Sequence, residues 1–190
     1  MDGEGGADDR RAEGTYVSTD AVIAREVAAV VGDIESTPGY WRPFVRRHAL
    51  VTALFVGVLL ALGATGYADR AGVLRATTLA LVVMAGLTAL DGWQVRRRLR
   101  GAVRAQVRGS CPPGTPVSAT WTSQDVVFRL PSHEVRLLLG TVSGARVREG
   151  VLLLDQPSVP RAWSVPVELL GADGLPLLRT ALGARLHEPL

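Results

Sequence analysis

The sequence predicts a membrane α-helical hairpin joined to a small α+β cytoplasmic domain with an antiparallel sheet and a C-terminal helix. Three observations predict this fold class. The chain is 47% apolar with a mean hydropathy of +0.21, two long apolar runs follow one another near its middle, and apolar and polar residues alternate beyond residue 117. A single cysteine, Cys111, excludes an intramolecular disulfide framework.

The N-terminal region is acidic, with nine acidic residues and three arginines between residues 1 and 35. Residues 1–14 are predicted to be a disordered acidic tail, and residues 15–39 a cytoplasmic segment with an amphipathic helix. The apolar residues of this helix recur at helical intervals: Ile23, Val27, Val30 and Ile34. Because Arg25 is the only base on its polar face, we expect the helix to pack on protein and not on anionic lipid.

Residues 40–93 are predicted to form a transmembrane hairpin with spans at about 49–68 and 71–92. The first span is a continuous uncharged run, long enough to cross a hydrocarbon layer of about 30 Å at about 1.5 Å per residue. The second has a shorter apolar run, 76–90, and reaches full length if Arg75 extends its guanidinium toward the headgroups. A buried core helix is the alternative interpretation of so short a run.

Arginines predict the orientation of the hairpin. Nine flank it on the side of the chain termini, whereas only Arg70 and Arg75 lie near the turn. This asymmetry predicts a multi-pass protein of the cell membrane with both termini in the cytoplasm. No signal peptide is predicted, because Met1 begins an acidic, Gly-rich stretch. Four aromatic residues are expected to form an interface belt at the cytoplasmic face: Tyr40, Trp41, Phe44 and Trp93.

Residues 94–116 are predicted to be an Arg-rich helix and a linker that continue from the second span. Six arginines are candidate contacts for anionic lipid headgroups: Arg96, Arg97, Arg98, Arg100, Arg104 and Arg108. Each would contribute about 1 kcal/mol near a negatively charged leaflet. A topology signal on a solvated face explains the same residues equally well. On the first span, a small residue at every fourth position favours close packing with the second span or with another copy of the chain.

Residues 117–190 are predicted to be a cytoplasmic β-rich domain with a C-terminal helix. Period-two alternation predicts strands beginning near Val117, Val126 and Val135, and two further strands flank a turn at Glu149-Gly150. Three prolines are expected to close off the sheet: Pro157, Pro160 and Pro166.

The last helix is predicted to begin near Asp173, with an apolar face of Leu175, Leu178, Leu182 and Leu186. Trp163 is expected to be a core anchor between this helix and the sheet. A module of this size has marginal stability alone, so we expect its core to be completed by a helix from the N-terminal segment, by the membrane or by a second copy.

The chain resembles the YcxB-like bacterial membrane proteins over most of residues 15–186. The resemblance rests on Thr15-Tyr16 with Asp20, on the hairpin, on the strand-turn-strand of 142–154 and on the run from Val159 to Ser164. It departs from the family at 138–141, where the family often has a tryptophan. The resemblance implies a two-helix hairpin with a pleckstrin-homology-like cytoplasmic domain, and it implies no chemistry.

No catalytic, cofactor-binding or metal-binding residues are predicted, because the three histidines, His48, His133 and His187, are far apart with no carboxylate or thiol at ligand spacing. We therefore expect a membrane-anchored binding or regulatory module without enzymatic activity or cofactor. An accessory subunit of a transporter or cell-envelope complex is the alternative. The expected partners are the bilayer, anionic headgroups, and a second copy or a larger membrane complex, but not nucleic acid.

Overall fold

The computed structural model describes residues 11–65, 69–159 and 162–187. The chain divides into two compact units. Met1–Gly32 together with Ala102–Leu190 form the first, which we call the β unit, and Asp33–Gly101 form the second, which we call the hairpin unit. The N-terminal segment therefore belongs with the β-rich domain, although more than sixty residues separate them in sequence.

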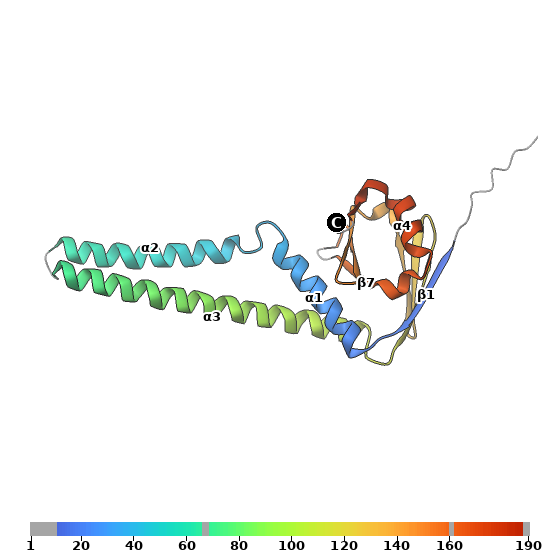
Figure 1. Cartoon of the computed structure of the whole chain (residues 1–190), viewed down its shortest axis with the longest axis horizontal. Coiled ribbons are helices and arrows are strands. Elements are labelled where there is room, and N and C mark those ends of the chain that lie inside the picture. Colours follow the sequence, from blue (N-terminus) through green and yellow to red (C-terminus); the bar gives the residue numbers. More distant parts are fainter. Residues whose placement is uncertain (1–10, 66–68, 160–161, 188–190) are drawn as a thin grey trace, which may run out of the picture. The chain divides into compact units, whose positions relative to one another are not determined.

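The hairpin unit contains α2 (Arg42–Ala64) and the larger part of α3 (Arg70–Ser110), which run side by side in opposite directions (Figure 1). Pro43 stands in the first turn of α2, where its missing N–H needs no partner. Gly63 allows close approach near the tip, since a Cβ atom there would lie 2.8 Å from Val73 Cγ2. The prediction that one helix continues through the Arg-rich segment is confirmed, and it ends before Pro112 and Pro113.

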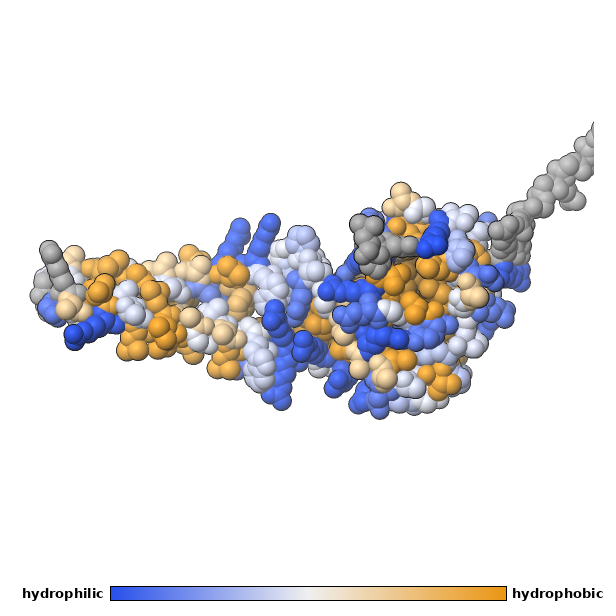
Figure 2. All heavy atoms as spheres, viewed as in Figure 1, coloured by the Kyte–Doolittle hydropathy of each residue, from blue (hydrophilic) through white to orange (hydrophobic). Residues whose placement is uncertain are grey.

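The surface of these two helices is apolar. Both are long and apolar enough to cross a membrane, and none of the residues in their most apolar windows is buried. Exposed leucine, valine and phenylalanine side chains cover much of the hairpin face seen in Figure 2. The second apolar run is therefore not a buried core helix of this chain.

The β unit contains two four-stranded sheets. The order of the first is β1-β2-β3-β4, antiparallel throughout, with β1 at Ala12–Val17, β2 at Pro116–Trp121, β3 at Asp125–Leu130 and β4 at His133–Leu138. The order of the second is β7-β6-β5-β8, with β5 at Gly144–Arg148, β6 at Val151–Asp155, β7 at Trp163–Pro166 and β8 at Leu186–His187. The prediction of antiparallel strands is confirmed, but β8 adds a short parallel pair with β5.

Strand β1 corrects the prediction that residues 1–14 are disordered, because the strand begins at Ala12; residues 1–10 lie outside the described part of the chain. Ala12 and Gly14 are buried on one face and pair with Trp121 and Ala119 of β2. The alternation is short and contains a glycine, so its β pattern is weak in the sequence. Gly14 is needed for packing, since a Cβ atom there would lie 2.2 Å from the carbonyl oxygen of Leu169.

Strand β7 corrects the prediction that the prolines end the sheet. Trp163–Pro166 pairs with β6, with Pro166 opposite Val151. The strand lies at the edge of its sheet, where a residue without an N–H is tolerated because one side of the strand has no partner. Pro160 lies outside the described residues.

Helices complete the core of the β unit. Helix α1 (Asp20–Ser36) has the predicted amphipathic pattern, and its Ala29 packs against Val151 and Leu153 of β6. Helix α4 (Gly174–Leu182) buries Leu177, Leu178 and Leu182 in the main core. It is shorter than predicted, because Gly183 has φ +53° and ends it, so that Leu186 lies in β8. The N-terminal segment therefore supplies both a helix and a strand to this core.

Trp121 is the centre of the main core and is fully buried. Its ring lies edge-on to Phe128, with 5.8 Å between ring centroids, and its indole N–H donates to the Leu169 carbonyl at 2.7 Å. This hydrogen bond joins the first sheet to the 3₁₀ turn at Val167–Leu170. A buried indole without such an acceptor would be costly, so the contact fixes where the turn lies.

Candidate functional site

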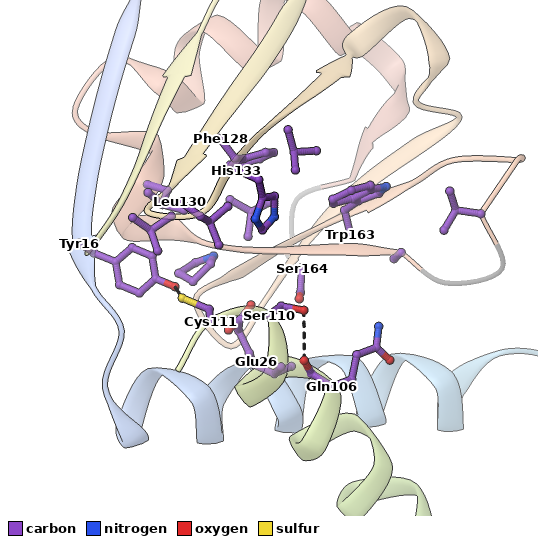
Figure 3. Close-up of a pocket in the computed structure, with 18 residues that line it drawn as sticks. Tyr16, Glu26, Gln106, Ser110, Cys111, Phe128, Leu130, His133, Trp163 and Ser164 are labelled. Carbon is purple, nitrogen blue, oxygen red and sulfur yellow. Dashed lines mark hydrogen bonds between the residues drawn. The ribbon is translucent and has the colours of Figure 1, made fainter. Parts of the chain in front are cut away.

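The β unit contains a cavity of about 420 Å³, within the size range of small-molecule pockets. Its walls come from α1, β1, β3, β4, β7 and the end of α3, as Figure 3 shows. Apolar side chains form one part of the wall, including Phe128, Leu130, Val135 and Trp163. Polar side chains gather in another part, namely Tyr16, Glu26, Ser110, Cys111 and Ser164. Mostly apolar walls with a few polar groups at one place are typical of a ligand site.

Glu26 is the charged group of this polar part, and only 6% of its surface is exposed. Burial raises the pKa of its carboxyl group to about 7, although the Ser164 hydroxyl group donates a hydrogen bond to it and Arg25 attracts the ionised form. The Arg25 guanidinium itself is paired with Glu168, at 2.5 Å. Burial alone would raise the pKa of Glu168, but the hydrogen bond from Arg25 lowers it below its usual value. Glu26 is thus the carboxylate of this group without a paired cation among the described residues.

Tyr16 and Cys111 lie beside Glu26 in the same wall (Figure 3). The Tyr16 hydroxyl oxygen lies 3.9 Å from the Cys111 sulfur. Burial, followed by the proximity of Cys111 and Glu26, raises the pKa of Tyr16 far above its usual value. The phenol therefore remains protonated at neutral pH and offers both a hydrogen-bond donor and an acceptor to the cavity.

Trp163 packs against the main core, as predicted, but it also lines the cavity. The fully buried tryptophan of the core is Trp121, whereas Trp163 is half-buried at the core margin and lines the cavity. Its indole N–H reaches the Gln156 side-chain oxygen at 3.3 Å. Trp163 is in the wall because it belongs to the edge strand β7, and the sequence did not predict this strand.

The six candidate lipid-contact arginines all lie on α3, but they have different surroundings. Arg96 is paired with Glu35 at 3.2 Å and lies over the Trp41 ring, and Arg97 lies over the Trp93 ring. Arg108 is paired with Asp20 of α1. Part of the cluster therefore neutralises acidic residues of the chain itself. Three other candidates occupy the same helix: Arg98, Arg100 and Arg104.

Three of the four residues predicted as an interface belt form an aromatic cluster in the hairpin unit, namely Tyr40, Trp41 and Phe44. The Tyr40 and Trp41 ring centroids lie 5.0 Å apart, and the Trp41 and Phe44 centroids lie 5.7 Å apart, both edge-on. Trp93 is 55% exposed and contacts Arg97. Stacking under arginine and exposure to the surroundings are both typical of aromatic residues at an interface.

Two histidines have surroundings that the sequence does not indicate. His48 Nε2 lies 3.4 Å from an Asp91 carboxylate oxygen, a pair that the spacing of these residues in the sequence does not indicate. His133 begins β4 and lines the same cavity as Cys111. The contact between His48 and Asp91 joins residues distant in sequence, which only the tertiary fold brings together. Within residues 11–65, 69–159 and 162–187, no three His, Cys, Asp or Glu side chains gather as a metal site would require.

The cavity itself was not predicted. The sequence predicts residues 94–116, which include Cys111, as a helix and linker, and residues 15–39, which include Tyr16 and Glu26, as an N-terminal segment with an amphipathic helix. One feature of the sequence does indicate that Glu26 is buried. It lies three positions after Ile23 and three before Ala29, which places an acidic residue on the buried stripe of α1. No protein family, curated protein or solved structure matches the chain.

Proposed function

We propose that this protein is a membrane-anchored binding module, with α2 and the first half of α3 crossing the bilayer as a hairpin. The observation that carries the proposal is the exposed apolar surface of these helices. Leu54, Val58 and Leu87 are each more than half exposed, as are many of their apolar neighbours. Exposed apolar surface on this scale requires a non-aqueous environment, and the helix lengths suit a hydrocarbon layer.

We propose further that both chain termini and the β unit are cytoplasmic. The nine-to-two distribution of arginines supports this orientation. The contacts of Arg96 and Arg97 with Trp41 and Trp93 suit a cytoplasmic interface, where guanidinium groups reach headgroups and indole rings lie between water and hydrocarbon.

Extraction and sided labelling test the proposal. The protein should stay in the membrane pellet after alkaline carbonate washing. In a Cys111→Ser background, single cysteines placed by Ser123→Cys in the β2–β3 turn and Thr65→Cys at the end of α2 form a matched exposed pair. A membrane-impermeant maleimide should label the Thr65→Cys variant in intact cells and the Ser123→Cys variant only after permeabilisation.

Two results would contradict the proposal. Release of the protein by carbonate would contradict membrane insertion, and the reverse labelling pattern would contradict the orientation.

Anionic lipid is the binding partner that we propose for the arginines of α3. Arg98, Arg100 and Arg104 are the residues to test, because Arg96 and Arg108 already pair with acids of the chain. Full-length protein purified in mild detergent should retain more anionic phospholipid than the triple Arg→Gln variant, measured by mass spectrometry. The matched control replaces Arg129, an exposed arginine of β3. Equal retention by the parent and the triple variant would reduce the cluster to a topology signal.

A further inference from the structure

The cavity of the β unit is a site that the proposed membrane function does not use. It has an apolar wall and a polar part that are drawn from different elements, so only the folded unit assembles it (Figure 3). We propose that this cavity binds a small amphiphilic amine, with the ammonium group against the Glu26 carboxylate and the apolar body against Phe128, Val135 and Trp163.

The charge of the polar part selects the headgroup. Arg25 is paired with Glu168, so that among the residues that the structure describes the hydrogen bond to the buried Glu26 carboxylate comes from the Ser164 hydroxyl group, while Arg25 attracts the carboxylate without bonding to it. A buried carboxylate without a directly bonded cation is unfavourable, and a bound ammonium group would remove part of that cost. The wall residues that the structure describes include no arginine, and an anionic headgroup would be repelled by the Glu26 carboxylate.

The neighbours of Glu26 suit an ammonium group in particular. The hydroxyl oxygens of Tyr16 and Ser164 both lie in the polar part and can accept hydrogen bonds. With the Glu26 carboxylate, they supply acceptors for the three N–H donors of a primary ammonium. Among the wall residues that the structure describes, the remaining titratable side chains are Cys111, beside Tyr16, and His133, which contacts Ser132 Oγ at 2.9 Å.

The opposite wall selects the apolar body. This wall combines aromatic rings and branched side chains from three different strands: Trp163, Phe128, Leu130 and Val135. Figure 3 shows the Trp163 indole on one side of the space and Leu130 on the other. A ligand with one aromatic ring or a short alkyl chain would bury its apolar surface there.

Calorimetric titration of full-length protein in lipid nanodiscs tests the proposal, with empty nanodiscs subtracted. Three probes share one phenylethyl body and differ in the headgroup: 2-phenylethylamine, 2-phenylethanol and 3-phenylpropanoate. We expect the amine to bind at least tenfold more tightly than the alcohol, and the carboxylate to bind most weakly. Glu26→Gln should weaken the binding of the amine at least tenfold and leave the affinity for the alcohol unchanged.

Two variants control for folding and for location. Glu134→Gln neutralises an exposed acid of β4 outside the cavity wall and should leave amine binding unchanged. Val135→Trp fills the cavity and should abolish binding of all three probes, while thermal unfolding confirms that each variant is folded.

Three results would overturn the proposal: no amine binding to the parent protein, carboxylate binding equal to amine binding, or unchanged amine affinity in a folded Glu26→Gln variant. Because membrane extraction and sided labelling do not depend on the cavity, failure here would leave the proposed membrane function standing.

Discussion

Glu26 gives the β unit a pH-dependent stability whose sign follows from its environment. Its pKa is raised from 4.5 to about 7, so the folded protein keeps a proton between these values that the unfolded chain has lost. Its contribution to the free energy of unfolding is therefore most favourable below pH 4.5 and declines as the pH rises through about 7.

We predict that Glu26→Gln removes this decline. At about 1.4 kcal/mol per pKa unit, the parent should lose about 3 kcal/mol relative to the variant between pH 4.5 and pH 8. Chemical denaturation of both proteins at several pH values measures the difference. Comparison with the variant is essential, because Asp125, whose pKa is lowered by the hydrogen bond from Thr122, contributes with the opposite sign at lower pH. Parallel stability curves for the two proteins would contradict the prediction.

Two tryptophans of the β unit should respond differently to truncation. Trp121 is fully buried and bonded to the Leu169 carbonyl, so Trp121→Ala should cost about 3–5 kcal/mol in the free energy of unfolding. Trp163 is half-buried beside an existing cavity, so Trp163→Ala should cost clearly less. Denaturant unfolding of both variants tests this order. An equal loss of stability in Trp163→Ala and Trp121→Ala would contradict this order and would show that Trp163 anchors the core as strongly as Trp121.

These two residues also show what the sequence predicts at this scale. Trp121 follows Val117 and Ala119 at period two, so its inward orientation is readable from the pattern. The surroundings of Trp163 depend on β1, α1 and the end of α3, which approach it only in the folded chain. Burial along one strand is a local property, whereas a cavity is a property of several elements together.

At the scale of elements, β1 is held by a close backbone approach. Gly14 leaves no room for a side chain against Leu169, and Gly171 has φ +61° with its own α-carbon facing the Glu13 carbonyl. A Cβ atom at Gly171 would lie 2.3 Å from that oxygen. Strand β1 and the turn after β7 can therefore pack this closely only because Gly14 and Gly171 have no side chains.

We predict that Gly14→Ala destabilises the β unit by about 1–3 kcal/mol, because β1 must shift away from Leu169. The matched control is Gly109→Ala in α3, where nothing lies within 4 Å of the added Cβ atom. Alanine is a better helix former than glycine, so the control should gain up to about 1 kcal/mol. Limited proteolysis and thermal unfolding distinguish the two variants, and equal effects would show that β1 is not tightly packed.

Helices were more predictable than sheets for a physical reason. The apolar stripe of α1 and the long apolar runs of α2 and α3 are repeated over many residues, so their patterns are strong. Strands β1 and β7 are short, contain glycine or proline, and are defined by partners far away in the sequence. The predicted C-terminal helix reaches Leu186, whereas α4 ends at Leu182, because the position of Leu186 fits the apolar stripe of a helix as well as it fits a strand.

At the scale of the whole molecule, the β unit requires both ends of the chain. A fragment that begins at Gln94 retains β2 to β8 and α4, but it lacks β1 and α1. It would expose the edge of β2 and the apolar surface of β6 that Ala29 covers.

We predict that this fragment is protease-sensitive and prone to aggregation, and that addition of a peptide covering residues 11–36 restores resistance. Limited proteolysis and light scattering measure both effects. A peptide with Gly14→Val provides the control, because it keeps the length and blocks the fit to Leu169. A fragment that is resistant without any peptide would show that the N-terminal elements are dispensable.

The hairpin and the β-rich region were predictable as separate segments, but their interleaving in the chain was not. Hydropathy identifies the apolar helices without reference to other parts of the molecule. The pairing of β1 with β2 depends on a register between Ala12–Val17 and Pro116–Trp121, and nothing local in either strand specifies it. This is why the N-terminal segment was expected to supply only a helix.

The neighbouring position of β1 and β2 in one sheet also determines the order in which the molecule can be made. Strand β1 leaves the ribosome first, but its partner follows roughly a hundred residues later, a long separation for adjacent antiparallel strands. If the intervening hairpin inserts first, the effective loop between the strands becomes much shorter and closure costs less entropy. If the proposed membrane function is correct, insertion would therefore speed the folding of the β unit, and a chain that is not inserted would expose the unpaired edge of β2 for longer.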